Sequence, residues 1–115
     1  MTLGEKQRLF TKLIARLIQY AYENGFELSF GDAYRDARVH GPLGRKVGYS
    51  SAQSNHKRRL ACDLNLFIDG IYQTQTAAYT DLGNYWRGLH DLCEWGGEGS
   101  RSDGNHFSMN HEGRW

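Results

Sequence analysis

The sequence LACDLNLFIDGIYQTQ, residues 60–75, decides the fold of this chain. Apolar side chains stand at every second position of its first nine residues, which is the pattern of a strand with one buried face. These residues are Leu60, Cys62, Leu64, Leu66 and Ile68. Asp69-Gly70 is a hairpin signal, so residues 71–75 are expected to return as a second, antiparallel strand.

Two helices and two further strands are expected around this hairpin. Residues 5–24 carry apolar side chains at three- and four-residue spacing, which predicts an amphipathic helix. Residues 80–95 repeat this spacing and stop at Gly96-Gly97. Residues 26–30 and 106–109 favour strands. Helices segregated from a hairpin-linked sheet indicate an α+β fold, with a small antiparallel sheet and the helices packed on one face.

Length and composition limit the class of protein. A chain of 115 residues with 14 glycines predicts one loop-rich globular domain, residues 1–115, and we expect a monomer. The net charge of +1 gives no bulk attraction to nucleic acid or to anionic membranes, and Lys57-Arg58-Arg59 is interpreted as a solvated basic run. We therefore expect no nucleic-acid partner, and a nucleic-acid-binding protein that uses this run is the weaker alternative. Cys62 and Cys93 form no CxxC pair and are interpreted as reduced, partly buried thiols, although a single bridge stays open.

The start of the chain shows no targeting feature. It lacks the apolar core and the cleavage site of a secretory signal, and no stretch is long and apolar enough to cross a bilayer. We therefore expect synthesis in the cytoplasm without a signal peptide, and no insertion into a membrane. These features leave the place of action open.

Two segments, forty-odd residues apart, carry side chains typical of a metal site. The first offers His56 and Asp63, and the second offers His106 with Asp103 three residues before it. Two imidazoles and one carboxylate form a borderline donor set suited to zinc, with an open fourth position where a catalytic zinc binds water. Asp63 supports this interpretation, because an acid inside an apolar strand is costly unless a cation or hydrogen-bond donors satisfy it. The alternative is an ordinary carboxylate on a wet sheet face.

Asp103 is the candidate general base of such a site. A carboxylate beside a zinc can take the proton of water as the water attacks a carbonyl. Residues 103–105, Asp-Gly-Asn, are also the ordinary composition of a turn, so a plain turn remains the alternative. Glu94 and Glu98 are rival bases. Together these residues predict a zinc site on the open face of the sheet.

In combination, these motifs resemble those of the VanY-like (M15) zinc peptidases. That family contains D-alanyl-D-alanine carboxypeptidases and phage L-alanyl-D-glutamate endopeptidases. The resemblance rests on the Ser-x-His-x(6)-Asp segment at 54–63 and on the Asp-x-x-His-Phe segment at 103–107, which Trp95-Gly96-Gly97 precedes. The pair Tyr34-Arg35 fits the arginine that the family places before its first ligand. The similarity runs from about residue 30 to residue 109.

The resemblance implies a role for each of these residues. His56, Asp63 and His106 would hold zinc, and Asp103 would be the base and later the proton donor to the leaving amine. Arg35 would stabilise negative charge on the substrate, although a structural pairing with Asp32 or Asp36 is the alternative. The substrate-binding candidates are Tyr34 and Ser54, and Ser54 is equally suited to capping a local loop.

Two departures from the family pattern bear on substrate preference. Ser108 stands where many members carry glutamate, and residues 98–102 lack the aromatic side chain that several relatives have. The function expected from the resemblance is a zinc metallopeptidase that cuts peptidoglycan stem peptides, first as a phage endolysin-type L-alanyl-D-glutamate endopeptidase acting on the cell wall or within a virion. The alternatives are a D-alanyl-D-alanine carboxypeptidase and a non-catalytic zinc-containing module that binds the cell wall or a protein.

Overall fold

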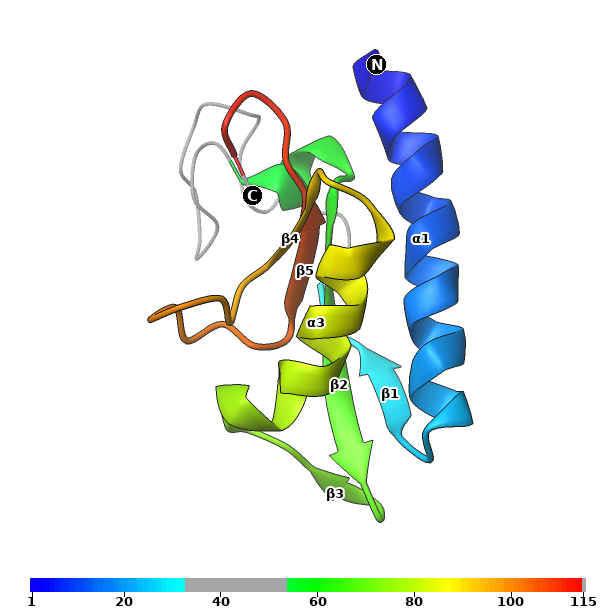
Figure 1. Cartoon of the computed structure of the whole chain (residues 1–115), viewed down its shortest axis with the longest axis vertical. Coiled ribbons are helices and arrows are strands. Elements are labelled where there is room, and N and C mark those ends of the chain that lie inside the picture. The colour runs from blue at the N-terminus through cyan, green and yellow to red at the C-terminus, as the bar shows by residue number, and fades with distance from the viewer. Residues whose placement is uncertain (33–53, 115) are drawn as a thin grey trace.

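The computed structural model of this chain describes residues 1–32 and 54–114 (Figure 1). The helices α1 and α3, two short 3-10 turns, η1 and η2, and the strands β1 to β5 make up this part of the chain. In chain order they are α1 (Leu3–Glu23), β1 (Glu27–Phe30), η1 (Asn55–Arg58), β2 (Ala61–Ile68), β3 (Ile71–Tyr72), η2 (Thr76–Tyr79), α3 (Thr80–Leu89), β4 (Cys93–Trp95) and β5 (His106–Met109).

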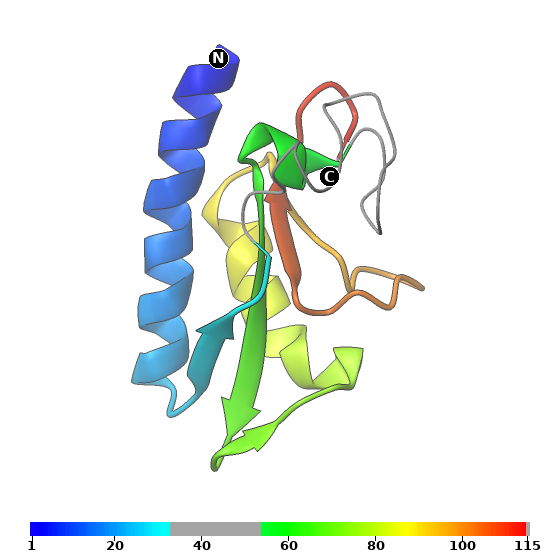
Figure 2. The ribbon, with the colours of Figure 1, turned by 180° about the vertical axis from the view of Figure 1, so that it is seen from behind.

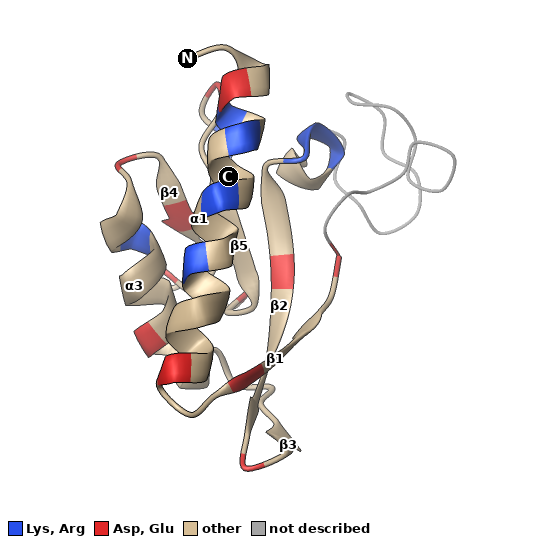
Figure 3. Ribbon diagram, turned by 90° about the vertical axis from the view of Figure 1, so that its right-hand side faces the viewer, with Lys and Arg blue, Asp and Glu red and all other residues tan. Residues whose placement is uncertain are grey.

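The strands form one antiparallel sheet in the order β1-β2-β5-β4, and β3 pairs with the carboxyl end of β2. Helices α1 and α3 lie together on one side of this sheet, as the view from behind in Figure 2 and the side view in Figure 3 show. The predicted α+β fold, with helices on one face, is therefore confirmed.

The core lies between the helices and the sheet. Trp86 of α3 is fully buried and meets the ring of Phe107 in β5 edge-on, with ring centroids 6.2 Å apart. Its indole N–H donates to the backbone carbonyls of Glu94 and Ser108, both at 3.0 Å. This shared hydrogen bond ties α3 to both β4 and β5, which fixes the helix over the sheet.

The hairpin after β2 has the predicted turn but a shorter return strand. Asp69 and Gly70 have φ angles of 52° and 77°, as a two-residue hairpin turn requires. The return strand β3 ends at Tyr72 instead of continuing to residue 75. Gln73 still donates its N–H to the Leu66 carbonyl at 2.8 Å, but the N–H of Leu66 donates to the Tyr79 hydroxyl at 3.0 Å and not to the Gln73 carbonyl, so the strand pairing stops there.

The second predicted helix, residues 80–95, is wrong in its last third. Helix α3 ends at Leu89, and Cys93–Trp95 form strand β4 against β5. The side chain of His90 accepts the N–H of Leu92 at 3.0 Å and so terminates the helix. The apolar residues of this stretch fit both a helical and an alternating period, and pairing with β5 decides between them.

Three smaller predictions can also be compared with the structure. Cys62 and Cys93 are both buried and free, as predicted, and burial raises the pKa of each thiol to about 12. The prediction that residues 57–59 form a solvated basic run is wrong for Arg58, which is only 9% exposed. None of the described helices has the length and apolar character needed to cross a membrane.

Candidate metal centre

His56 is held on the 3-10 turn η1, immediately before β2. The hydroxyl of Ser54 accepts the backbone N–H of His56 at 3.2 Å and so caps the start of the turn. Arg59 ends the turn in the left-handed region, with φ 57°. The side chain of His56 is only 1% exposed. The sequence therefore places an imidazole on a short, capped turn whose geometry is fixed at both ends.

A buried asparagine braces this turn from behind. Asn55 is fully buried, and its amide donates to the carbonyls of Met109 at 3.0 Å and Arg114 at 2.8 Å. Its carbonyl oxygen accepts a hydrogen bond from Arg58, which also donates to the carbonyl of His111. The turn that carries the first imidazole is thus bonded to the chain end that follows β5, although more than fifty residues separate them in sequence.

Asp63 is the third residue of β2 and lies directly opposite His106 of β5 in the strand register. Its backbone is also fixed on the other side, because the N–H of Gly31 donates to the Asp63 carbonyl at 2.8 Å and the N–H of Asp63 donates to the Asp32 carbonyl at 2.6 Å. Since side chains of directly paired residues project from the same face, this register brings the carboxylate and the imidazole together.

Asp103 and His106 are joined by a tight turn that leads into β5. The N–H of His106 donates to the Asp103 carbonyl at 3.1 Å, while Gly96 bonds both residues through its own N–H and carbonyl. A Cβ atom at Gly96 would overlap the Asp103 carbonyl and lie 2.8 Å from the His106 Cβ. Only glycine therefore allows β4 to approach this turn so closely.

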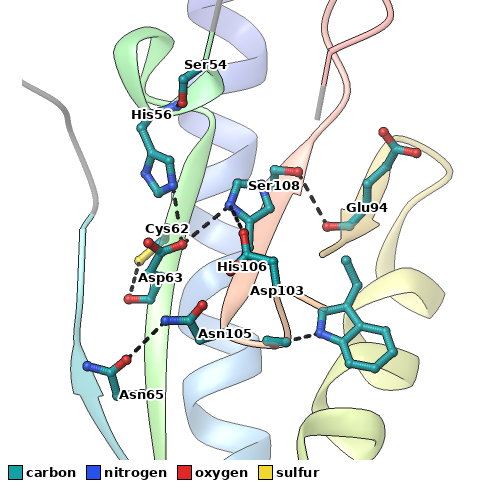
Figure 4. A network of polar contacts seen from close by, with 12 residues as sticks. Ser54, His56, Cys62, Asp63, Asn65, Glu94, Asp103, Asn105, His106 and Ser108 are labelled. Carbon is teal, nitrogen blue, oxygen red and sulfur yellow. Dashed lines mark hydrogen bonds and ion pairs between the residues drawn. The ribbon is translucent and has the colours of Figure 1, made fainter. Parts of the chain in front are cut away.

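These elements bring four of the predicted site residues together (Figure 4). The Asp63 Oδ1 atom lies 3.3 Å from His56 Nε2 and 3.4 Å from His106 Nδ1. One ligand atom from each of these three residues lies within 4.8 Å of the other two. The Asp103 carboxylate is 4.0 Å from His106 Nδ1 and its side chain is 60% exposed. The cluster is a buried His-Asp-His set with a second, solvent-accessible carboxylate at its edge.

The geometry and the chemistry of the three residues fit a divalent metal such as zinc. Zinc bonds of 2.0–2.2 Å in tetrahedral geometry separate neighbouring ligand atoms by roughly 3.3–3.6 Å, which matches both Asp63–imidazole distances. Burial alone would raise the pKa of Asp63, but the hydrogen bonds and charges of His106 and His56 outweigh it and lower the pKa to about 2. The carboxylate is therefore ionised, as a metal ligand must be.

The remaining candidates from the sequence are Tyr34, Arg35 and the two rival bases. Tyr34 and Arg35 lie outside the described residues. The rival base Glu94 points away from the cluster in Figure 4, and its carboxylate accepts a hydrogen bond from Asn110 at 3.0 Å. The other rival, Glu98, pairs with Arg87 at 3.0 Å. Neither glutamate belongs to the cluster, whereas Asp103 does lie beside it.

The sheet of this α+β domain thus presents a His-Asp-His cluster that could hold a metal ion, with the exposed Asp103 carboxylate at its edge. A comparison with protein families identifies the family to which the chain belongs. The family model described as D-alanyl-D-alanine carboxypeptidase, of the M15 peptidases, matches residues 48–109. This is more than half of the chain, which therefore belongs to that peptidase family.

The fold is also similar to that of a solved structure, the L-Ala D-Glu endopeptidase ChiX of Serratia marcescens. The two share 19% sequence identity with a TM-score of 0.64, over 93% of this chain and 85% of that one. At this identity the likeness shows a common fold. No curated protein sequence matches the chain.

Proposed function

We propose that this protein is a zinc peptidase that cuts the stem peptides of bacterial peptidoglycan. One observation carries the proposal: the Asp63 carboxylate lies within 3.4 Å of two imidazole nitrogens, and the exposed Asp103 carboxylate stands at the edge of the same cluster. Membership of the carboxypeptidase family supports the reaction, which is hydrolysis of a peptide bond. The donor set of two nitrogens and one oxygen supports zinc.

In this proposal His56, Asp63 and His106 hold the metal, which when bound polarises the substrate carbonyl and lowers the pKa of water. Asp103 is exposed and outside the donor set, so its carboxylate is free to take the proton of the attacking water. The same group then returns the proton to the leaving amine. The tight turn between Asp103 and His106 holds the backbone of Asp103 beside that of His106, so the carboxylate starts from a position next to the cluster.

Three further roles rest on the motif resemblance. Arg35 would stabilise the negative charge that develops on the substrate, with Tyr34 beside it at the substrate. Ser54 uses its hydroxyl to accept the N–H of His56, which favours a role in holding the first imidazole in place. For the chain as a whole, we propose that residues 1–115 act as one monomeric domain on the cell wall, with no nucleic-acid partner.

Within this class, our first candidate is an L-alanyl-D-glutamate endopeptidase of the phage endolysin type. The motif resemblance supports it, and the similar fold of ChiX, itself an L-Ala D-Glu endopeptidase, is consistent with it. The description of the matching family favours the second candidate, a D-alanyl-D-alanine carboxypeptidase. A non-catalytic module with a structural zinc fits less well, because a structural site is closed and needs no free carboxylate such as Asp103 beside it.

Digestion of purified peptidoglycan tests the proposal directly. The protein is incubated with peptidoglycan, with and without a chelator, and the new chain ends are identified by mass spectrometry. We expect new amino termini at one bond of the stem peptide, and their loss when the chelator is present. An intact stem peptide in the presence of added zinc would refute the peptidase, and undiminished cleavage in the chelator would refute the role of the metal.

A further inference from the structure

Two asparagines continue the face of the sheet that carries the His-Asp-His cluster. Asp63 and Asn65 are two residues apart on β2, so their side chains project from the same face, about 7 Å apart along the strand. Asn105, the residue before His106, donates from its side-chain amide to the Asn65 Oδ1 atom at 3.2 Å. Figure 4 shows both asparagines on the same side of the sheet as Asp63. We call Asn65 and Asn105 the asparagine pair.

The backbone around this pair is fixed and leaves space beside it. The N–H of Leu64 donates to the Asn105 carbonyl at 2.9 Å, which continues the pairing of β2 with β5 by one residue. On the β1 side of β2, a Cβ atom at Gly31 would lie 3.0 Å from the Asp63 Cβ and 3.6 Å from the Asn65 Oδ1 atom. A side chain at this position would crowd both residues, and glycine has none.

The asparagine pair uses only part of its hydrogen-bonding capacity. The Asn105 amide nitrogen and the Asn65 oxygen bind each other, and within residues 1–32 and 54–114 neither the Asn65 amide nitrogen nor the Asn105 side-chain oxygen has a partner. Both side chains are partly exposed. The pair therefore offers N–H donors from one side chain and an acceptor oxygen from the other. The complementary ligand presents one C=O and one N–H side by side.

We propose that the asparagine pair binds the main chain of the substrate near the scissile bond: Asn105 accepts the N–H of one substrate residue, and Asn65 donates to the C=O of the same residue. The inference rests on the proposed function, which puts the scissile carbonyl at the cluster. In an extended chain the N–H and C=O of one residue point to the same side, and this repeats at every second residue, about 7 Å along. Asp63 and Asn65 have the same spacing, so a peptide lying along β2 with its carbonyl at the cluster presents its next such residue to the pair.

This contact reads the length of the substrate and not its side chains. The stem peptide must continue for about two residues on the side of the scissile bond that lies over the pair. Both substrate candidates meet this requirement, because the carboxypeptidase substrate continues on the acyl side and the endopeptidase substrate continues on the leaving side. A peptide that ends before it reaches the pair loses both hydrogen bonds and binds more weakly.

A scan of the substrate with backbone esters tests the proposal. Stem peptides are made uncleavable by replacing the scissile amide with a reduced CH2–NH link, and one further amide at a time is replaced by an ester, which removes a single N–H. Binding to the zinc-saturated protein is measured by titration calorimetry. We expect one ester, at the residue over the pair, to weaken binding about fivefold, the usual size of one hydrogen bond, and the others to change it by less than about twofold. Equal affinities across the whole series would overturn the inference.

Variants of the pair separate substrate binding from a purely structural bridge. In Asn105→Ala the ester penalty should disappear, because the substrate N–H has lost its acceptor; a penalty that survives in this variant would refute the assignment. Asn65→Asp keeps an oxygen for the Asn105 amide but replaces the donor with a carboxylate, so it should weaken binding of the all-amide peptide about tenfold with little change in Tm. Asn84→Asp, the same change at an exposed position on α3, should leave the affinity unchanged.

The two proposals fail in different ways. An ester penalty at one residue, together with no cleavage of any stem peptide, would refute the peptidase and support the role of the pair. Cleavage of stem peptides, together with equal affinities across the ester series, would refute the role of the pair and support the peptidase.

Discussion

Zinc should raise the thermal stability of this chain through His56, Asp63 and His106. These residues come from η1, β2 and β5, and the native fold brings one ligand atom of each within 4.8 Å of the others. The unfolded chain separates the outer two by fifty residues of sequence. A ligand that binds only the folded state adds RT ln(1 + [L]/Kd) to the free energy of unfolding, which is about 2.7 kcal/mol at a free zinc concentration of 100 times Kd.

The corresponding shift in Tm follows from the size of the chain. The entropy of unfolding is roughly 2.1 cal/mol/K per residue near 60 °C, which gives about 0.24 kcal/mol/K for 115 residues. Dividing the zinc contribution by this entropy predicts a rise in Tm of about 11 °C. Each further tenfold increase in free zinc should add about 6 °C, because it adds 1.4 kcal/mol.

Differential scanning calorimetry on chelator-treated protein, over a series of buffered zinc concentrations, measures this shift. His56→Ala removes one ligand from a side chain that is 1% exposed, so it should lower the Tm without zinc and abolish the response to zinc. Asp103→Asn, at an exposed position outside the donor set, should keep the full response. A Tm independent of zinc in the natural protein, or an equal rise in His56→Ala, would refute the three-residue site.

Three further outcomes are expected. Asp103→Asn should lower kcat on peptidoglycan by about 10²–10⁴-fold, the usual contribution of a general base, while elemental analysis still finds one zinc per chain; an unchanged kcat would exclude this role. Asn55→Ala should lower the free energy of unfolding, measured in urea, by about 1–3 kcal/mol, because the buried Met109 carbonyl loses a hydrogen-bond donor. A loss below about 0.5 kcal/mol, the usual size for a surface substitution, would contradict the bracing role. Gly96→Ala should weaken zinc binding, because the added Cβ would displace the turn at Asp103. Gly88→Ala is the control and should leave zinc binding unchanged, because a Cβ there would meet nothing within 4 Å. Equal zinc affinities in the two variants would contradict this account.

Local patterns in the sequence predicted the two strands that carry Asp63 and His106, but not the turn η1 that carries His56. Alternation over residues 60–68 placed Asp63 on the face opposite to the buried leucines, and the structure has it there. Residue type and spacing selected His56, Asp63 and His106, and the fold brings them together, while the binding of zinc by them stays a prediction. What the alternation could not give is the register of β2 against β5, since that pairing joins residues more than forty positions apart.

The second helix shows where such patterns become ambiguous. Apolar residues at 89, 92 and 93 satisfy a helical period, and those at 93 and 95 satisfy an alternating one. The outcome depends on β5, whose backbone groups pair with Cys93–Trp95. A strand of three residues gains little stability from its own sequence, so the presence of a neighbouring edge decides its conformation. The sequence alone does not show that edge.

Asn55 and Arg58 show a further limit. Asparagine and arginine are mostly exposed in proteins, and Arg58 belongs to the run that the sequence predicts to be solvated. Both residues are buried because the carbonyls of Met109, His111 and Arg114 accept their hydrogen bonds, and those carbonyls belong to the other end of the domain. Backbone carbonyls have no residue type, so no sequence pattern indicates that they will be partners. Metal ligands are recognisable because their chemistry lies in the side chain, whereas the residues that hold them in place act through a backbone that every residue shares.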